Sequence, residues 1–309
     1  MVVTVNIKNF PGTSQDQSGC PAGGGPSLHR LRSWRPRTTR AKVGLAAVAA
    51  VSSAGLVLAL AEGLSGVPAR PAWTMTAGNV QSLSQQDPRV AAHFFNTPRS
   101  YDAGASLVKT PVQAGYVTTP VLSYTSYAQF KSDISSGSIS YPYKWVMYDP
   151  EDWSQTPVNE QQDPARYMTL FGQLAHAHRL KVIQAPGLDL GAVSGSALPR
   201  RRGESVNQWF VRVNLAGTAA AAGDIFQLQD ESNTTAGSEY ASLFNSIQAQ
   251  AQAANPNVKV YSEVSTLNGT AAQMATAAES ISPDGFYVAA AGNMARTDQF
   301  FRLMKAAGY

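Results

Sequence analysis

The sequence is poor in the residues that support thiol and metal chemistry. Among its 309 residues it has one cysteine, Cys20, and four histidines. The chain beyond Cys20 can therefore form no disulfide and offers no thiol nucleophile. His176 and His178 are two positions apart on a predicted helix, so they point in different directions and do not form a metal pair. With His29 near the N-terminus, only His93 is left, and we expect no metal site.

Two motifs of common enzyme classes are also missing. No predicted strand is followed by the G-x-G-x-x-G turn that binds dinucleotide phosphates, so we expect no nucleotide cofactor and indeed no cofactor at all. The sequence has no G-x-S-x-G element either, which argues against a serine hydrolase of the α/β type.

Positive charge is scarce outside the N-terminal region. The whole chain has a formal charge of +4, but residues 1–61 hold seven of its 24 basic residues and one of its 20 acidic residues. The rest of the chain therefore has 17 basic and 19 acidic residues, a net charge of −2. Because the basic excess is confined to the N-terminal region, we expect no nucleic-acid partner.

The basic N-terminal region precedes an apolar run, Val43–Ala61, which ends in the small-x-small sequence Ala59-Leu60-Ala61. This pattern is typical of a cleaved export signal. Its length of 19 residues also suits an uncleaved membrane anchor, and either reading predicts a secreted or extracytoplasmic protein. We therefore divide the chain into a disordered basic leader (1–42), a signal or anchor segment (43–61), a linker (62–71) and a single domain (72–309).

From residue 120 onward, short apolar runs alternate with amphipathic stretches, which predicts βαβ units around a parallel sheet. Helix starts are indicated by Asp163-Pro164, Ser205, Ser238, Thr270 and Thr297, residue types that favour N-caps and first turns. The predicted strands are Val121–Ser126, Trp145–Asp149, Lys181–Ala185, Asp224–Gln229, Lys259–Val264 and Gly285–Ala289.

Polar residues inside the predicted strands favour a barrel over an open doubly wound sheet. Gln184, Gln227, Gln229 and Glu263 would be unusual in a sheet that is buried on both faces, whereas the upper interior of a barrel tolerates them. We therefore predict a (β/α)8-type TIM barrel, possibly irregular or incomplete. One or two strands must come from residues 72–119, and Gln113–Thr118 is the best candidate.

In such a barrel, functional residues gather at the C-terminal ends of the strands. There the sequence places carboxylates suited to acid and base roles and aromatic and amide side chains suited to a sugar. Two carboxylates with different environments can divide the work of glycoside hydrolysis. The acid/base candidates are Asp149, Glu151, Glu231 and Glu263, and the substrate-binding candidates are Trp153, Gln184, Gln227, Gln229, Tyr261 and Tyr287.

Each of these features also has a structural reading. Asp149-Pro150 could form a turn that leaves Glu151 solvated. Glu263 could be paired with Arg212 or Lys181, because an unpaired buried carboxylate is costly. The two glutamines Gln227 and Gln229 could satisfy each other's hydrogen bonds inside the barrel.

The stretch WVMYDPEDWSQTPVNEQQDPARY, with FGQLAHAHRLKVIQAPGLDL, FQLQDES and DGFYVAA, resembles a group of exported actinobacterial proteins with a glycoside-hydrolase-like TIM barrel. The resemblance covers about residues 115–309 and implies fold and location. Asp149-Pro-Glu151 is also similar to the D-x-E motif of chitinase-like and lysozyme-like barrels, in which the last acid is the proton donor. Only this minimal spacing is present, because the preceding D-x-x-D half of the chitinase motif is missing.

Two functions follow from this reading. The first is an exported glycoside hydrolase that cleaves a polysaccharide or cell-wall glycan by paired carboxylates. The second is a protein on the same scaffold that binds a glycan or cell wall without turnover. Both take a glycan or another small polar molecule as their partner, and both contact a membrane only through residues 43–61.

Overall fold

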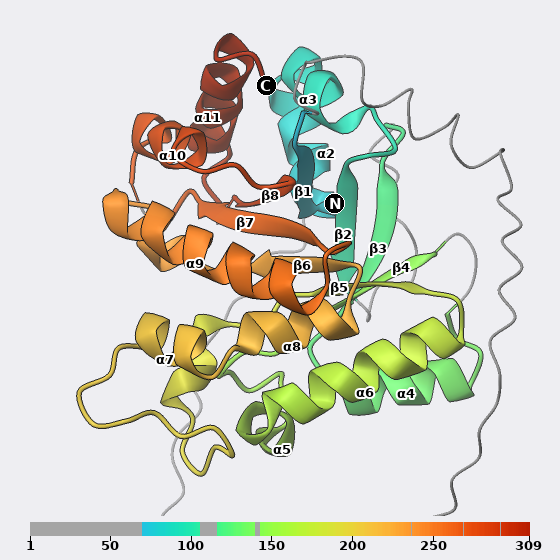
Figure 1. Cartoon of the computed structure of the whole chain (residues 1–309). Helices are drawn as coiled ribbons and strands as arrows, with labels where there is room; N and C mark the ends of the chain where they lie inside the picture. The colour runs from blue at the N-terminus through green and yellow to red at the C-terminus, as the bar shows by residue number, and fades with distance from the viewer. Residues whose placement is uncertain (1–69, 106–115, 140–142, 236, 268, 291) are drawn as a thin grey trace, which may run out of the picture. The chain divides into compact units, whose positions relative to one another are not determined.

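Eight parallel strands close into a barrel in the computed structural model, which describes residues 70–105, 116–139, 143–235, 237–267, 269–290 and 292–309 (Figure 1). Each strand pairs with the next one in the chain, and β8 pairs with β1 to complete the ring. The predicted TIM barrel is thus confirmed over the open sheet. The strands are β1 (Ala72–Thr76), β2 (Tyr101–Ala105), β3 (Thr119–Tyr124), β4 (Trp145–Tyr148), β5 (Lys181–Gln184), β6 (Ile225–Leu228), β7 (Lys259–Ser265) and β8 (Gly285–Ala289).

The six predicted strands agree with β3 to β8 to within two residues at each end. The two further strands, β1 and β2, come from residues 72–105, not from Gln113–Thr118. Within that stretch, residues 113–115 lie outside the described part, and residues 116–118 are not in a strand. They lead into β3, whose first residue, Thr119, donates its amide hydrogen to the Ser100 carbonyl at 2.8 Å.

Helices fill the connections between the strands and surround the barrel (Figure 1). In the described residues, two helices follow β1, one follows β3, and two follow β4. The helices are α2 (Ala77–Gln86), α3 (Pro88–Phe95), α4 (Tyr127–Ser135), α5 (Val158–Gln162), α6 (Pro164–Ala177), α7 (Val206–Arg212), α8 (Leu215–Ala222), α9 (Ser238–Ala254), α10 (Ala271–Glu279) and α11 (Met294–Ala306), with the short 3-10 helices η1 (Leu188–Ala192) and η2 (Glu231–Asn233).

Most of the predicted helix starts are confirmed at their caps. The Asp163 side chain accepts a hydrogen bond from the Arg166 amide, directly before Pro164. Ser205 and Thr270 each form a capping box with a glutamine three residues later, which satisfies two free amide groups at the start of each helix.

The prediction for the last helix is wrong at its start. Helix α11 begins at Met294, and Asn293 is its N-cap, so Thr297 lies inside the first turns and does not open the helix. The Thr297 hydroxyl donates to the Asn293 carbonyl at 3.0 Å, which lets this polar side chain be buried within the helix.

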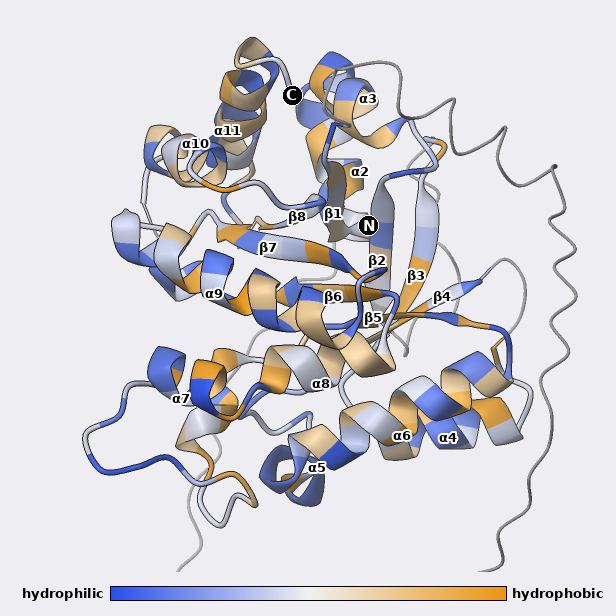
Figure 2. Ribbon diagram, in the orientation of Figure 1, coloured by the Kyte–Doolittle hydropathy of each residue, from blue (hydrophilic) through white to orange (hydrophobic). Residues whose placement is uncertain are grey.

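The outward faces of the strands pack against the helices and form the main hydrophobic core. Figure 2 shows apolar segments along the strands and on the helix faces, while the loop that precedes α7 is strongly hydrophilic. This loop holds Arg200, Arg201 and Arg202, all exposed. Helices α6 and α8 approach closely at Gly172, where an added Cβ would lie 2.1 Å from the Ala222 carbonyl oxygen.

A separate cluster of side chains fills the lower interior of the barrel. It contains Ala72, Val121, Met147, Ile183, Ala185, Ile225 and Tyr261, with Tyr101 and Trp145 packed against it. Gly285 makes room for the Tyr261 ring, because a Cβ at that position would lie 2.6 Å from the ring. We call this cluster the barrel floor. Its apolar packing closes the interior below the polar residues described next.

None of the helices in the described ranges has both the length and the apolar character to cross a membrane. The predicted signal or anchor segment, residues 43–61, lies outside those ranges, so its role stays a prediction.

Candidate active site

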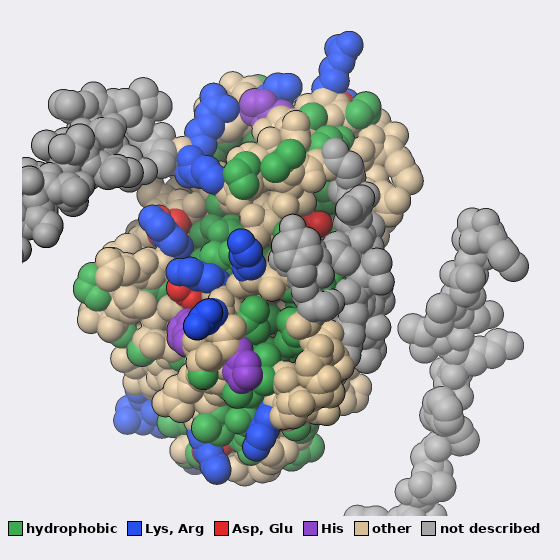
Figure 3. Space-filling view, turned by 90° about the vertical axis from the view of Figure 1, so that its right-hand side faces the viewer, with side chains coloured by type: hydrophobic (Ala, Val, Ile, Leu, Met, Phe, Trp, Pro, Cys, Tyr) green, Lys and Arg blue, Asp and Glu red, His purple; other side chains and the backbone are tan. Residues whose placement is uncertain are grey.

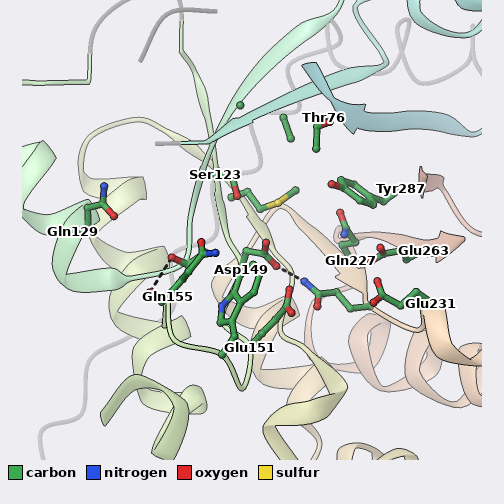
Figure 4. Close-up of a pocket in the computed structure, with 16 residues that line it drawn as sticks. Thr76, Ser123, Gln129, Asp149, Glu151, Gln155, Gln227, Glu231, Glu263 and Tyr287 are labelled. Carbon is green, nitrogen blue, oxygen red and sulfur yellow. Dashed lines mark hydrogen bonds between the residues drawn. The ribbon is translucent and has the colours of Figure 1, made fainter. Parts of the chain in front are cut away.

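A cavity of about 310 Å³ opens at the C-terminal ends of the strands, above the barrel floor (Figure 4). Eight of the ten predicted site residues line it. They are the carboxylates Asp149, Glu151, Glu231 and Glu263 and the side chains of Trp153, Gln227, Gln229 and Tyr287. These residues come from β6, β7 and β8 and the segments that follow β4 and β6, so the closure of the barrel brings distant parts of the chain together.

Asp149 lies at the end of β4 and is held there by backbone and side-chain contacts. The Asp149 amide donates to the Tyr124 carbonyl at 2.9 Å. The carbonyl of the following residue, Pro150, accepts from the Gly187 amide at 2.9 Å. The pair Asp149-Pro150 therefore extends the strand pairing and does not form a turn away from the barrel. The Gln229 amide group donates a hydrogen bond to the Asp149 carboxylate.

The environment of Asp149 favours its protonated form. Burial raises its pKa to about 7, the hydrogen bond from Gln229 opposes the rise, and the nearby Glu231 and Asp189 carboxylates add to it. Gln229 also donates to the Ala185 carbonyl at 2.8 Å, which fixes the amide between the two acceptors. The two glutamines Gln227 and Gln229 thus have separate roles, since Gln229 is bonded to Asp149 and Ala185.

Glu151 points into the same cavity although it lies on the loop after β4. Its amide donates to the Thr156 hydroxyl at 3.2 Å, and its side chain passes over Gly187, where a Cβ would lie 2.9 Å from the Glu151 Cγ. Burial, followed by the charges of Asp149, Asp189 and Glu231, raises the pKa of Glu151 to about 8. Glu151 is therefore protonated near neutral pH, as a general acid must be. Asp152, its neighbour, is exposed.

Glu263 is almost fully buried, with 4% of its surface exposed. Neither of the cations considered from the sequence neutralises it. Arg212 pairs with Glu204 at 2.6 Å, and Lys181 pairs with Asp224 at 2.8 Å. Instead, Glu263 is hydrogen-bonded to the side chain of Glu231, and burial together with this carboxylate raises the pKa of Glu263 well above its usual value. The environment of Glu263 therefore favours its protonated form.

Gln227 and Tyr287 complete the inner part of the cavity (Figure 4). Gln227 has 2% of its surface exposed, and its Oε1 atom has no hydrogen-bond partner in the described part of the chain. A buried polar atom without a partner is costly, so such an atom at the base of a cavity marks a place for a ligand group that donates a hydrogen bond.

Two of the predicted binding residues lie elsewhere. Gln184 points outward from β5, because its neighbours Ile183 and Ala185 face the interior and side chains alternate along a strand. It is buried against α6 and donates to the Met168 carbonyl at 3.1 Å. The expectation that it lines the site is wrong because it assigned the wrong face of β5.

Tyr261 faces inward but at the wrong depth. It lies two residues before Glu263 on β7, and a strand rises about 3.3 Å per residue, so its ring is roughly 7 Å lower. The ring belongs to the barrel floor and also lines a second cavity at the other end of the strands. Tyr261 is therefore a structural residue, and not the sugar platform that the sequence suggested.

Several residues that the sequence did not single out also line the cavity. They are Thr76, Ala103, Gly104, Ser123, Thr125, Gln129, Met147 and Gln155. For Ser123 a signal was available, since it follows the inward-facing Val121 by two positions on β3. For Thr76, Ala103 and Gly104 there was none, because β1 and β2 were not recognised as strands.

The loop that carries Trp153 is fixed by its own polar contacts. The Trp153 indole donates to the Thr156 hydroxyl at 2.9 Å, and the Gln161 side-chain amide donates to the Trp153 carbonyl at 2.6 Å. This holds the indole at the edge of the cavity, where an aromatic face can pack against a sugar ring. Within the described residues, no group of three or more His, Cys, Asp or Glu side chains is arranged to hold a metal ion.

No family model and no curated protein matches the chain. Among solved structures, it is similar to the BexX/CysO complex of Amycolatopsis orientalis, with 11% identity and a TM-score of 0.43, over 77% of this chain and 89% of that chain. It is also similar to a sugar phosphate isomerase/epimerase from Parabacteroides distasonis, with 11% identity and a TM-score of 0.42, over 79% and 96%. At these values neither protein's activity transfers to this chain.

Proposed function

We propose that this chain is an exported glycoside-hydrolase-like enzyme that cleaves a polysaccharide or cell-wall glycan. The observation that supports the proposal best is the pairing of two different carboxyl environments in one cavity. Glu151 is protonated near neutral pH, and the Glu231–Glu263 pair keeps a carboxylate beside it. Glycoside hydrolysis needs one carboxylic acid and one carboxylate around the scissile bond.

Each carboxylate takes a distinct role in this proposal. Glu151 protonates the leaving oxygen of the glycosidic bond, which agrees with its place at the end of the D-x-E spacing. Glu231 acts as the base or nucleophile, and Glu263 orients it through their hydrogen bond. Asp149, held by Gln229, ionises above its pKa of about 7, and its negative charge then stabilises an oxocarbenium-like transition state. Trp153 and Tyr287 offer ring faces for the sugar.

Export is the second part of the proposal, and it is supported by the leader pattern alone. The arginines that precede Val43–Ala61 and the small residues at its end match an export signal. The substrate would then be a glycan outside the cytoplasm.

A second candidate function is a binding protein that does not cleave its glycan. It is favoured by the raised pKa values of Asp149 and Glu263, because a cavity whose carboxyl groups are mostly protonated holds few ionised groups for a nucleophilic step. Such a cavity would still bind the hydroxyl groups of a sugar.

The test is a screen of the purified full-length protein against bacterial and plant glycans, with analysis of the products. We expect release of sugars, and a loss of roughly 10²–10⁴-fold in kcat for Glu151→Gln, the range for removing a general acid. Asp149→Asn and Glu263→Gln should also lower kcat strongly. The exposed Glu239→Gln serves as the matched control and should leave kcat unchanged. Full activity in both Glu151→Gln and Asp149→Asn would contradict the assignment, and binding without any turnover would establish the second candidate.

A further inference from the structure

The charge of the cavity restricts which sugars it can take. All charged side chains that line it are acidic: Asp149, Glu151, Glu231 and Glu263, and no lysine, arginine or histidine is among the described residues at its wall. The charges that act on the Glu151 carboxyl group are those of Asp149, Asp189 and Glu231, again all acidic. An anionic sugar, whether a uronic acid or a phosphorylated sugar, would find no cation to pair with at the described wall of the cavity.

A second observation locates the point of contact. The Oε1 atom of Gln227 is buried at the inner wall without a hydrogen-bond partner, and Figure 4 places Gln227 beside Tyr287 and near Glu263 and Glu231. This acceptor requires a donor, and the carboxyl oxygens of the adjacent Glu231–Glu263 pair can accept further hydrogen bonds. An ammonium group provides three donors and no acceptor, together with a positive charge, whereas a hydroxyl provides one donor.

We propose that the pocket is selective for a hexosamine with a free, positively charged amino group, which would lie against Gln227 Oε1 and the Glu231–Glu263 pair. The identification of the ligand as a sugar rests on the proposed function, whereas the preference for an amine rests on the charge and the free acceptor of the cavity. Charge-assisted hydrogen bonds are roughly twice as strong as neutral ones, so the amine contributes most of the selectivity.

Binding to the purified full-length protein tests this without relying on turnover. Calorimetric titrations at about pH 6 would compare glucosamine and galactosamine with glucose, N-acetylglucosamine and glucuronic acid. We expect at least one hexosamine to bind about tenfold or more tightly than the neutral and N-acetylated sugars, with glucuronic acid the weakest. Gln227→Leu and Glu263→Gln should remove most of this preference, and Glu239→Gln should keep it.

The possible outcomes separate this inference from the proposed function. The preference for an amine would be overturned if both hexosamines bound no more tightly than the other sugars, or if none of the five sugars bound. It would also be overturned if calcium or magnesium displaced the hexosamine at a concentration lower than that of the hexosamine. A second assay compares cleavage of partly deacetylated chitooligosaccharides with that of a neutral β-glucan. Cleavage without preference for the amine would contradict the inference and still support the proposed hydrolase. Selective binding of the amine without any cleavage would support the inference and contradict the hydrolase.

Discussion

Gln229 is a side chain that connects two of the strand ends around the cavity. Its Nε2 atom donates both to the Asp149 carboxylate, directly after β4, and to the Ala185 carbonyl, directly after β5. Its hydrogen bond is also the one influence that lowers the pKa of Asp149, while burial and the neighbouring acids raise it. The protonation state of Asp149 therefore depends on one amide.

We expect Gln229→Met to raise the pKa of Asp149 further above about 7, because the substitution keeps the size of the side chain and removes its donor. Carboxyl carbon NMR measured across a pH series would give the value directly. Gln155→Met is the control, since Gln155 lines the same cavity but is not one of the groups that shift the pKa of Asp149. An unchanged midpoint in Gln229→Met would contradict this account of the site.

The residues that reach the site could be predicted from the sequence only where two conditions held. The strand had to be recognised, and its inward face and depth had to be known. For Gln227, Gln229 and Glu263 both conditions held, because polar side chains at alternate positions mark an inward face. For Gln184 the wrong face of the strand was assigned. For Tyr261 the depth within the barrel was wrong, since a sequence gives no measure of height within a barrel.

Among the connecting segments, α5 positions the loop that carries Glu151 and Trp153. Its residue Glu160 has 1% of its surface exposed. The carboxylate accepts hydrogen bonds from the Tyr148 hydroxyl at 2.7 Å, from the Ser126 hydroxyl at 3.1 Å, and from the Tyr127 and Ala128 amides at 2.6 and 3.1 Å. It therefore joins β4 and the N-terminus of α4 to the loop.

Glu160→Gln should destabilise the fold by roughly 2 kcal/mol, because hydrogen bonds to a charged group are worth about 1.5–3 kcal/mol and a neutral amide cannot replace all four. Urea unfolding would measure the change. Glu239→Gln provides a matched comparison, since Glu239 lies in the first turn of a helix as Glu160 does, but is exposed. Equal stabilities of the two variants would refute the role assigned to Glu160.

The elements themselves were predictable where their signals are local. Ser205 and Thr270 lie within three residues of the amides they cap, so the sequence shows both partners together. Strands β1 and β2 lack such signals: β1 is followed at once by a helix, and β2, with the sequence YDAGA, has no β-branched residue. The contact between Glu160 and Ser126 joins residues 34 apart and leaves no pattern in the sequence.

The two cavities at opposite ends of the barrel differ in the charge of the side chains that line them. The cavity at the C-terminal ends is lined by acids, whereas the cavity of about 420 Å³ at the N-terminal ends is lined by Arg70, Arg99 and Lys259, with Asp284 paired to Lys259 at 3.0 Å. Figure 3 shows one face of the molecule on which lysine and arginine side chains outnumber acidic ones.

The raised pKa values also predict how the stability of the whole protein depends on pH. Asp149 and Glu151 have pKa values of about 7 and about 8 in the folded protein, above the ordinary values of 3.8 and 4.5 that apply in the unfolded chain. The folded protein therefore binds more protons than the unfolded chain between these limits, and its free energy of unfolding falls as the pH rises through them.

Unfolding in urea should thus require on the order of 6 kcal/mol more at about pH 5 than at about pH 8. In the double variant Asp149→Asn/Glu151→Gln this difference should shrink, because the two titrating groups are gone. The exposed pair Asp152→Asn/Glu239→Gln removes as much charge and should retain the difference. A double variant at the cavity with the same pH dependence as the unaltered protein would show that other groups control the stability.

The barrel floor has a kinetic consequence. Because Tyr261, Met147 and their neighbours seal the interior from below, a molecule that reaches Gln227 can withdraw only through the opening by which it came. A molecule bound at this innermost position must therefore leave before the next one can bind there. If catalysis takes place there, the released sugar and fresh substrate pass through the same opening, so product release comes before each new binding event.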